Sequence, residues 1–473
     1  MSLLQSGIIG VLAFIFILGA AVVLHEFGHF IVAKLFKIRV ETFSFGFGPR
    51  LFGWKRGHTD YRVSLIPLGG YVKLGGDESN APIEGEGAPD IPAHERFDLR
   101  PRWQRILVAL AGPVMNVLTA IAIPFAAAMI YGVPSMPTPI VSYVIPGGAA
   151  ERAGLRSGDR IVSFNGTDNP TWEAIENDGL LSPGQDLPLT VKRDDQNVPL
   201  TIRPTPRTEY GETAGMLEFT PDNGGYPVEV RAVTPGSPAA AAGLQVGDRL
   251  VAAGGQDVKS AAQVRGYIRE RKAQPLDLTV LRNGETKKIA VSADRLPGGL
   301  IGVVPADAFP IHRARPLASL RYAINSNIRI LRVTGQALGQ VFSGKRSVRD
   351  TVSGPIGIFR VASASANEGG WAGVFVTLAF LSLNLGIFNL LPIPVLDGGA
   401  IFLLLIEGAL AKVGLSISRT IRERIQQVGF VMVILLMVFV ITNDLIKQTS
   451  MFRGSGDSSP TPAASPAQPG PTR

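Results

Sequence analysis

Two histidines and a glutamate near the N-terminus have the residue types and the spacing of a metal-dependent hydrolase. His25 and His29 are four residues apart, so in a helix both imidazoles lie on one face and can bind one metal ion. Glu26 follows the first histidine and stands beside the metal rather than on it. This H-E-x-x-H arrangement is typical of zinc peptidases, in which the glutamate acts as the general base.

The apolar segment around this motif strengthens the functional interpretation. The run from Ile8 to Phe36 is hydrophobic and long enough to cross about 30 Å of hydrocarbon as a helix. Ionisable side chains inside such a span are costly and persist mainly where they serve a function. The alternative is a pair of satisfied core histidines, but the cost of three ionisable residues in one hydrophobic span favours the metal site.

A third ligand is offered by Asp397, far along the chain from the histidines. It follows Pro392 and Pro394, which cannot sit inside a regular helix without freeing backbone carbonyls. Broken backbone at membrane depth is tolerated only where it is buried in protein or lines a wet cavity. The alternative is an aspartate that only caps the following helix.

The absence of cysteine limits the kind of metal site. Without thiolates, zinc must be bound by histidine, aspartate or glutamate. Two histidines and one carboxylate, with a fourth position left for water, have the composition of a catalytic zinc site. The ligand set His25, His29 and Asp397 is therefore the one we predict.

A polar residue also interrupts the second apolar run. Asn116 ends the stretch Ala111–Asn116 (AGPVMN), where small side chains allow close helix packing and the proline can kink the helix. An amide inside a membrane span is expensive unless it is hydrogen-bonded. It either binds a neighbouring helix or positions groups at the metal, and we include it among the residues expected at the substrate-binding site.

The composition indicates a membrane protein of several parts. Of the 473 residues, 46% are hydrophobic and 18% are charged, and this length suggests about three domains. Four apolar runs are predicted to span the membrane: 1–36, 106–131, 371–391 and 426–446. The first lacks a basic leader, and cleavage would remove the histidine motif, so we interpret it as a retained helix rather than a signal peptide.

The basic residues behind the net charge of +8 flank these runs, which favours membrane topology over nucleic-acid binding. The short basic loops 37–105 and 392–425 should therefore be cytoplasmic. Both termini and the large insert between the second and third spans then lie outside the cytoplasm. The histidine motif and Asp397 come out at the same, cytoplasmic half of the membrane.

The first loop contains two strand-like stretches, Glu41–Phe47 and Tyr61–Leu74. We predict a β-hairpin that is either solvated or dips towards the active site, where its edge pairs with unwound substrate. The acidic, Pro/Gly-rich stretch Asp77–Glu95 is expected to be a mobile loop.

Two further segments lie outside the spans. Region 306–370 has apolar residues at helical spacing among arginines, which predicts an amphipathic helix lying on the membrane or against the insert. The tail 447–473 is predicted to be disordered, because it is rich in Pro, Ser and Ala beyond Ser455.

The insert contains an internal repeat of about 89 residues. Ala153–Ile161 and Ala242–Leu250 both read A-G-L-x-x-G-D-R followed by an aliphatic residue, and each continues with a helical patch and a strand. The period is too long for a solenoid, so we predict two tandem domains, 132–222 and 223–305, which resemble PDZ domains of bacterial proteases. Peptide binding at a sheet edge and a size-exclusion or gating role are equally good interpretations.

Together these motifs resemble the site-2 protease family of intramembrane zinc metalloproteases, in its bacterial RseP-type (regulator of sigma-E protease) branch. HEFGH at 25–29, AGPVMN at 111–116, two PDZ-like domains and NLLPIPVLDGG at 389–399 follow in the expected order. We therefore expect a multi-pass α-helical membrane protein with four transmembrane helices, a cytoplasmic-side β-loop and two tandem PDZ-like α+β domains.

The resemblance implies Zn²⁺ as cofactor and Glu26 as general base. It implies that Asn389 and the Pro392/Pro394 segment bind the extended substrate backbone, with the strand-like loop near Tyr61–Leu74 pairing from the other side. The implied substrates are transmembrane segments of single-pass proteins, such as anti-sigma factors and signal-peptide remnants, after an upstream site-1-type protease has trimmed them. The implied location is the bacterial inner membrane, with the lipid bilayer and no nucleic acid as partner.

Two other functions fit parts of the sequence. A non-catalytic membrane scaffold would use the PDZ-like domains to tether partners and would not need Glu26. A zinc transporter would need ionisable residues through both halves of the membrane, and the outer halves of the spans lack them.

Overall fold

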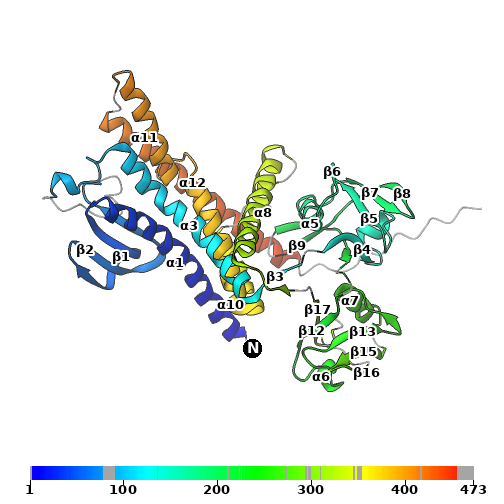
Figure 1. Ribbon diagram of the computed structural model, residues 1–473. Coiled ribbons are helices and arrows are strands. Elements are labelled where there is room, and N and C mark those ends of the chain that lie inside the picture. The colour runs from blue at the N-terminus through cyan, green and yellow to red at the C-terminus, as the bar shows by residue number, and fades with distance from the viewer. Residues whose placement is uncertain are drawn as a thin grey trace, which may run out of the picture. The chain divides into compact units, whose positions relative to one another are not determined.

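The computed structural model describes residues 3–77, 91–135, 137–209, 212–222, 224, 226–271, 274–292, 294, 296, 300–308, 311–344, 347–348, 354–415 and 418–454. The chain divides into two compact units (Figure 1). The first comprises Met1–Ala120 with Ser347–Arg473, and the second comprises Ile121–Arg346.

The first unit is built mainly from long apolar helices. Among the described residues, four helices are long and apolar enough to span a membrane: α1 (Leu3–Leu35), α3 (Arg102–Tyr131, which continues into the second unit), α10 (Pro355–Asn389) and α12 (Arg419–Gly454). The four predicted spans therefore correspond to helices. Their side chains are largely aliphatic and aromatic, and most of them are not buried inside the protein, as expected for surfaces that face hydrocarbon.

Helix α10 is not straight. Gly370 has a φ of 55° and a ψ of −145°, a backbone conformation that favours glycine. The hydroxyls of Thr377 and Ser365 lie 2.8 Å apart, although twelve residues of straight helix would separate them by about 18 Å. The two halves therefore fold back on each other, and the half after Gly370 corresponds to the predicted third span.

The first half of α10 is fixed at its start by α12. The carboxylate of Asp444 accepts the backbone N–H groups of Gly354, Ile356 and Gly357 at 3.0, 3.0 and 3.2 Å. The first N–H groups of a helix have no partner within the helix, so this buried aspartate satisfies them from a different helix.

The predicted β-hairpin is present and longer than the strand-like stretches that indicated it. Strands β1 (Val40–Arg56) and β2 (Thr59–Leu74) pair antiparallel. Where the hairpin leaves α1, a small core forms around Ala33, Ile38 and Val40. This core fixes the hairpin to the end of the helix that carries the histidine motif. A short 3₁₀ turn, η1 (Ala93–Glu95), follows before α3.

The second unit contains two sheet modules of the same design. The first module consists of β4 (Thr138–Val144), α4 (Ala149–Arg152), β5 (Arg160–Phe164), β6 (Thr167–Asp168), α5 (Trp172–Leu181), β7 (Leu187–Arg193), β8 (Gln196–Ile202), β9 (Thr205–Glu209), β10 (Glu212–Met216) and β11 (Phe219–Asp222). The second module consists of β12 (Val228–Val233), α6 (Pro238–Ala241), β13 (Arg249–Ala253), β14 (Gln256–Asp257), α7 (Ala261–Glu270), β15 (Leu276–Arg282), β16 (Glu285–Val291) and β17 (Val303–Asp307).

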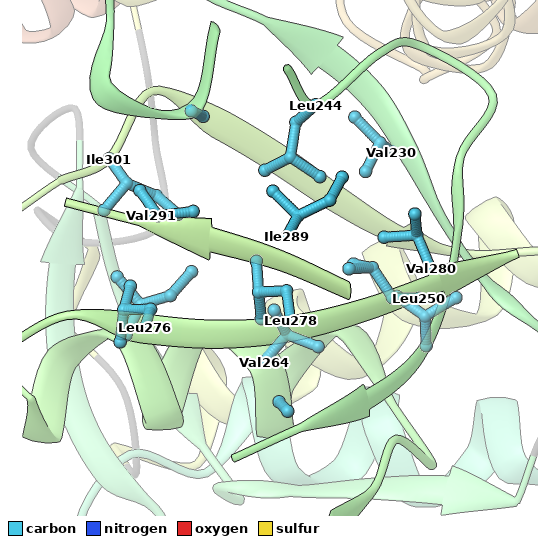
Figure 2. Packing of buried hydrophobic residues seen from close by; sticks show 14 of the residues in the cluster. Val230, Leu244, Leu250, Val264, Leu276, Leu278, Val280, Ile289, Val291 and Ile301 are labelled. Carbon is cyan, nitrogen blue, oxygen red and sulfur yellow. The ribbon is translucent and has the colours of Figure 1, made fainter. Parts of the chain in front are cut away.

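The two sheets have equivalent strand orders, β11-β4-β5-β7-β8 and β17-β12-β13-β15-β16, and β9 with β10 forms an additional pair in the first module. Their cores use equivalent positions. Val141, Leu155, Ile161, Ile175, Leu187, Leu189 and Val191 in the first module are each followed 89 residues later by Val230, Leu244, Leu250, Val264, Leu276, Leu278 and Val280. Figure 2 shows this second set interdigitating between sheet and helix. The buried positions thus recur at the spacing of the sequence repeat.

A buried charge pair also recurs. Asp159 and Asp248 have nearly inaccessible carboxylates, and each is bound through both oxygens by an arginine from the next long strand, Arg193 and Arg282 respectively. The N···O distances are both 2.7 Å in the first module and are 2.6 and 2.7 Å in the second. Each pair is a bidentate, charge-assisted contact that ties the G-D turn to the sheet.

The rest of the second unit is a helix and a short strand pair. Region 306–370 was predicted to hold an amphipathic helix, and α8 (Pro316–Phe342) lies within it. Strand β3 (Val133–Pro134) pairs with β18 (Ile311–His312), so the two ends of the insert are joined.

Two boundary predictions are wrong. The segment 392–425 is not all loop, because Asp397–Lys412 forms helix α11; its prolines and glycines masked an aliphatic stretch that follows them. The tail prediction from 447 fails for 447–454, where α12 continues, since extending an existing helix needs no new nucleation. Residues 455–473 of the tail and 78–90 of the acidic loop lie outside the described residues.

Candidate metal centre

The predicted ligands come together in the first unit. His25 Nε2 lies 3.2 Å from His29 Nε2 and 3.1 Å from an oxygen of Asp397, and His29 Nε2 lies 3.5 Å from the other oxygen. The described residues thus bring the donor atoms of two histidines and one carboxylate within 4.8 Å of one another. Two ring nitrogens that face each other beside a carboxylate need a cation or a proton between them.

The spacing of these atoms fits zinc. Atoms bound about 2.0–2.1 Å from a tetrahedral zinc ion lie about 3.3 Å apart. The three separations here bracket that value, and the donor set of two nitrogens and one oxygen is one that zinc accepts. The residues present therefore fit a zinc ion.

Helix α1 provides the two histidines on one face, and close packing against α3 makes room for the site. A Cβ on Gly112 of α3 would lie 2.2 Å from His29 Nε2, and a Cβ on Gly28 would lie 2.2 Å from the carbonyl oxygen of Ala111. Both distances are shorter than a real contact allows. The two glycines are thus required for α1 and α3 to approach closely enough for α3 to border the metal-binding face.

Asp397 is positioned by the non-helical turn between α10 and α11. Helix α11 begins at Asp397 after the cap residue Leu396, so Asp397 does not take the capping position, and its carboxylate faces the histidines. Val395 has a φ of 87°, which for a β-branched residue stores about 1–3 kcal/mol of strain. Gly398 and Gly399 let α11 pack on this turn, where a Cβ would come 2.2 Å from the carbonyl oxygens of the turn.

Glu26 is held beside the ligands by strand β2. The backbone N–H of Val72 hydrogen-bonds its carboxylate. A Cβ on Gly70 would come 3.4 Å from Glu26 Cγ, so the strand passes directly alongside this side chain. The hairpin therefore forms one wall of the site.

The other predicted residues have different surroundings. Asn389, at the end of α10, points its amide to within 3.2 Å of His25 Nε2, on the face where the ligands meet. Pro392 and Pro394 lie in the turn before Asp397, and Pro394 packs against Gly429 of α12. Asn116 is fully buried behind the His25 ring, which favours a positioning role over direct contact with substrate.

Some groups around the site were missed from the sequence. The carbonyl of Val108 lies 2.7 Å from His29 Nδ1, and Ser382 is hydrogen-bonded to Asn116. A backbone carbonyl gives no sequence signal. Ser382 is a hydroxyl within an apolar span, which is the same kind of sequence signal that Asn116 gives.

Comparison with known proteins identifies the family. The sequence profile of peptidase family M50 matches residues 13–436, which is most of the chain. The chain belongs to peptidase family M50. It is thus a membrane metalloprotease of the site-2 protease type, and the scaffold and transporter alternatives are not supported.

The chain matches several relatives over almost their whole length. The regulator of sigma-E protease RseP of Escherichia coli is 31% identical over 464 residues, 91% of this chain and 97% of its own. Protease RseP of Yersinia pestis is 32% identical over 463 residues, with the same coverage. A Vibrio cholerae protein named as a candidate zinc metalloprotease is 33% identical over 469 residues, 92% of this chain and 98% of its own.

The M50 family is zinc-dependent, so the cofactor is Zn²⁺. The family and the four long apolar helices together support an inner-membrane location.

Proposed function

We propose that His25, His29 and Asp397 hold the catalytic zinc and that Glu26 is the general base for hydrolysis of a peptide bond within the membrane. The observation that carries this proposal is the meeting of three donor atoms at tetrahedral spacing in apolar helices. When bound there, zinc activates a water molecule and polarises the scissile carbonyl.

Glu26 moves the proton in this scheme. Its carboxylate oxygen takes a proton from the attacking water and delivers it to the departing amide nitrogen. The Val72 N–H fixes one side of the carboxylate, so the proton is taken and released from a defined position. Apolar helices around the site keep bulk water from competing for that proton.

The substrate has to be extended to react. A transmembrane helix hides its carbonyls in its own hydrogen bonds, so the segment must unwind locally before attack. We infer that Asn389 and the turn containing Pro392 and Pro394 bind the unwound backbone on one side of the site. Strand β2 beside Glu26 supplies main-chain groups on the other side.

The substrate class follows from the relatives rather than from the site. Relatives 31% identical to the chain carry the name regulator of sigma-E protease. We propose that the chain likewise cleaves the transmembrane segment of an anti-sigma factor, and signal-peptide remnants, after an upstream site-1-type protease has trimmed them.

The membrane topology and the sheet modules belong to the same proposal. We infer that the active site faces the cytoplasmic half of the inner membrane and that both termini and the insert lie in the periplasm. The two modules, 132–222 and 223–305, are proposed to be PDZ-like domains. Their equivalent strand orders, with β11 and β17 at the sheet edges, support this.

A single substitution tests the catalytic assignment. Glu26→Gln keeps the shape of the side chain and removes the base, so cleavage of a single-pass membrane substrate should fall at least about 100-fold while zinc content stays at one ion per chain. Cleavage is followed on gels with purified full-length protein, and zinc by elemental analysis. Glu368→Gln, an exposed acid on α10, is the matched control and should cleave normally.

Wild-type cleavage by a zinc-loaded Glu26→Gln protein would refute the role of the base. Loss of zinc from that variant would instead place Glu26 among the ligands.

A further inference from the structure

The two histidine ligands are held in different ways. His29 Nδ1 lies 2.7 Å from the backbone carbonyl of Val108, so no side chain can be removed to free that ring. His25 Nδ1 lies 3.2 Å from the side-chain amide of Asn116. The orientation of His25 therefore depends on how that amide is itself held.

Asn116 is held by Ser382 on α10. The Ser382 hydroxyl lies 3.2 Å from the backbone carbonyl of Asn116 and 3.3 Å from its side-chain amide. Both residues are completely inaccessible to solvent. A buried amide or hydroxyl without a partner is destabilising, so each of these groups needs the other.

A consistent set of hydrogen bonds links the three residues when His25 Nε2 is given to the metal. Nδ1 then carries the hydrogen. Asn116 Nδ2 lies toward His25 Nδ1 and Asn116 Oδ1 lies toward Ser382 Oγ, so the amide must turn over, which exchanges two groups of the same shape, for its oxygen to accept from Nδ1–H. In the turned orientation the amide nitrogen of Asn116 donates to Ser382 Oγ, which in turn donates to the backbone carbonyl of Asn116. The His25 Nδ1–H and the Ser382 O–H each have an acceptor, and the ring is left with Nε2 facing His29 and Asp397.

Helix α10 is built to deliver this contact. Ser382, Gly386 and Asn389 lie four and three residues apart and so share one face of the helix. A Cβ on Gly386 would come 2.9 Å from the Pro113 carbonyl and 3.2 Å from Asn116 Cβ, so α10 touches α3 at this point. The same face ends at Asn389, 3.2 Å from His25 Nε2.

We propose that Ser382 is a positioning residue of the metal centre, which acts through Asn116 to orient the His25 ring so that Nε2 faces the zinc. The inference rests on the proposed ligand set. Partners of this kind, which hydrogen-bond the second nitrogen of a histidine ligand, typically change metal affinity 10- to 100-fold.

The test measures zinc affinity of the purified full-length protein in detergent by competition with a chelator. Ser382→Ala and Asn116→Leu should each raise the zinc Kd about 10- to 100-fold. Asn116→Asp keeps an acceptor for Nδ1–H and should stay near the wild-type Kd. Because both residues act on one ring, adding Ser382→Ala to Asn116→Leu should cause no further loss.

A matched control lies in the same helix. Thr377→Val removes the hydrogen bond to Ser365, which joins the two halves of α10, and should leave the zinc Kd unchanged. Co²⁺ bound in place of zinc gives a second readout. Its visible spectrum should change with Ser382→Ala and not with Thr377→Val, because only the former alters a ligand ring.

The outcomes separate two failures. If His25→Ala loses zinc while Ser382→Ala keeps the wild-type Kd and Co²⁺ spectrum, the positioning role is wrong and the ligand set stands. If His25→Ala binds zinc as the wild type does, the ligand set itself is wrong. If Thr377→Val weakened zinc binding as much as Ser382→Ala does, Ser382 would contribute only to general packing of α10, and the positioning role would be wrong. Should Ser382→Ala not fold, the contrast between Asn116→Asp and Asn116→Leu decides the proposal.

Discussion

The candidate metal centre and the Asp–Arg pairs of the sheet modules are both clusters of polar groups that are largely buried. They differ in whether all of their charges and hydrogen-bonding atoms have partners within the cluster. Asp159 and Asp248 each face an arginine through two hydrogen bonds and also accept a backbone N–H at 2.8 Å. Each arginine in turn donates to a backbone carbonyl. Charge and hydrogen bonds are both balanced within the module.

In the candidate metal centre, only the histidine nitrogens that face away from the ligand cluster have hydrogen-bond partners. His29 Nδ1 and His25 Nδ1 have partners, but both Nε2 atoms and the Asp397 carboxylate point at one another. Such an arrangement is complete only with a cation. A polar cluster whose charges and hydrogen bonds are all paired internally stabilises the fold. A cluster whose lone pairs point at one common position is suited to bind a cation there.

Of the changes that distinguish the candidate metal centre from the Asp–Arg pairs, removal of zinc should have the largest effect. Cleavage by chelator-treated, zinc-free protein should fall to background, because the site then has nothing to activate water. Both sheet modules should keep their hydrogen-exchange protection, since their charge pairs use no metal. Adding zinc back should restore cleavage. Persistent cleavage without zinc, or loss of protection in the modules, would contradict the distinction.

Gly112→Ala should come next in size. The added methyl group would lie 2.2 Å from His29 Nε2, so the ring or helix α3 must move, and displacements of about 1 Å can cost about 100-fold in rate. The measurement is substrate cleavage together with zinc content. Gly7→Ala in α1, where an added Cβ meets nothing within 4 Å, is the control and should behave as wild type. Normal cleavage by Gly112→Ala would show that the site tolerates a wider helix separation.

In the first module, Asp159→Asn should reduce stability without affecting zinc. Removing one charge of a buried, hydrogen-bonded pair leaves Arg193 without its counter-ion and should cost about 3 kcal/mol of unfolding free energy. Hydrogen exchange of β5 and β7 in the full-length protein measures the loss. Asp186→Asn, which breaks the exposed pair with Arg203, is the matched control and should leave exchange unchanged. Equal effects of the two would show that burial does not matter here.

The smallest effect should be a pH dependence in the second module. Burial by itself raises the pKa of the Asp248 carboxyl, but its hydrogen bonds to Arg282 and to the Gln245 backbone outweigh this and hold the pKa below its ordinary value. A pKa lowered on folding adds stability above the unfolded value of about 3.9, and that stability is lost as the pH falls through the folded value.

Wild type should therefore exceed Asp248→Asn in stability by a constant amount above about pH 5, and the difference should shrink below about pH 4. Hydrogen exchange of β13 and β15, corrected for the intrinsic rate at each pH, measures it. A difference that grows on acidification would mean that folding raises the pKa of Asp248.

Local pattern was enough for much of the fold. The four apolar runs are long hydrophobic stretches, the hairpin has strand-like residues, and the insert repeats its own sequence. Each of these patterns can be recognised in the sequence without knowing which residues pack together in space. Boundaries were less predictable. Helix α11 follows two prolines and lies in a segment predicted mainly as loop. Helix α10 reverses at Gly370, where the sequence offers only two adjacent glycines.

By itself, the sequence determined the chemistry that is possible. It supplied two histidines on one helix face, a glutamate next to them, a distant aspartate after broken backbone, and no thiol to compete for the metal. Residue type and helical period are properties of the chain alone, so these could be read before any fold was known.

Only the tertiary structure decided which groups orient that chemistry. Three contacts depend on how closely helices and a strand from distant parts of the chain approach one another. These are the contact of Gly112 with His29, the hydrogen bond from Val72 to Glu26, and the contact of Ser382 with His25 through Asn116. Approach distances of this kind are set by packing between residues that lie 46 to 266 positions apart in the sequence, and no local pattern encodes them. The H-E-x-x-H motif thus indicates the type of reaction, and the packing of α3, α10 and β2 around it positions the side chains of the site.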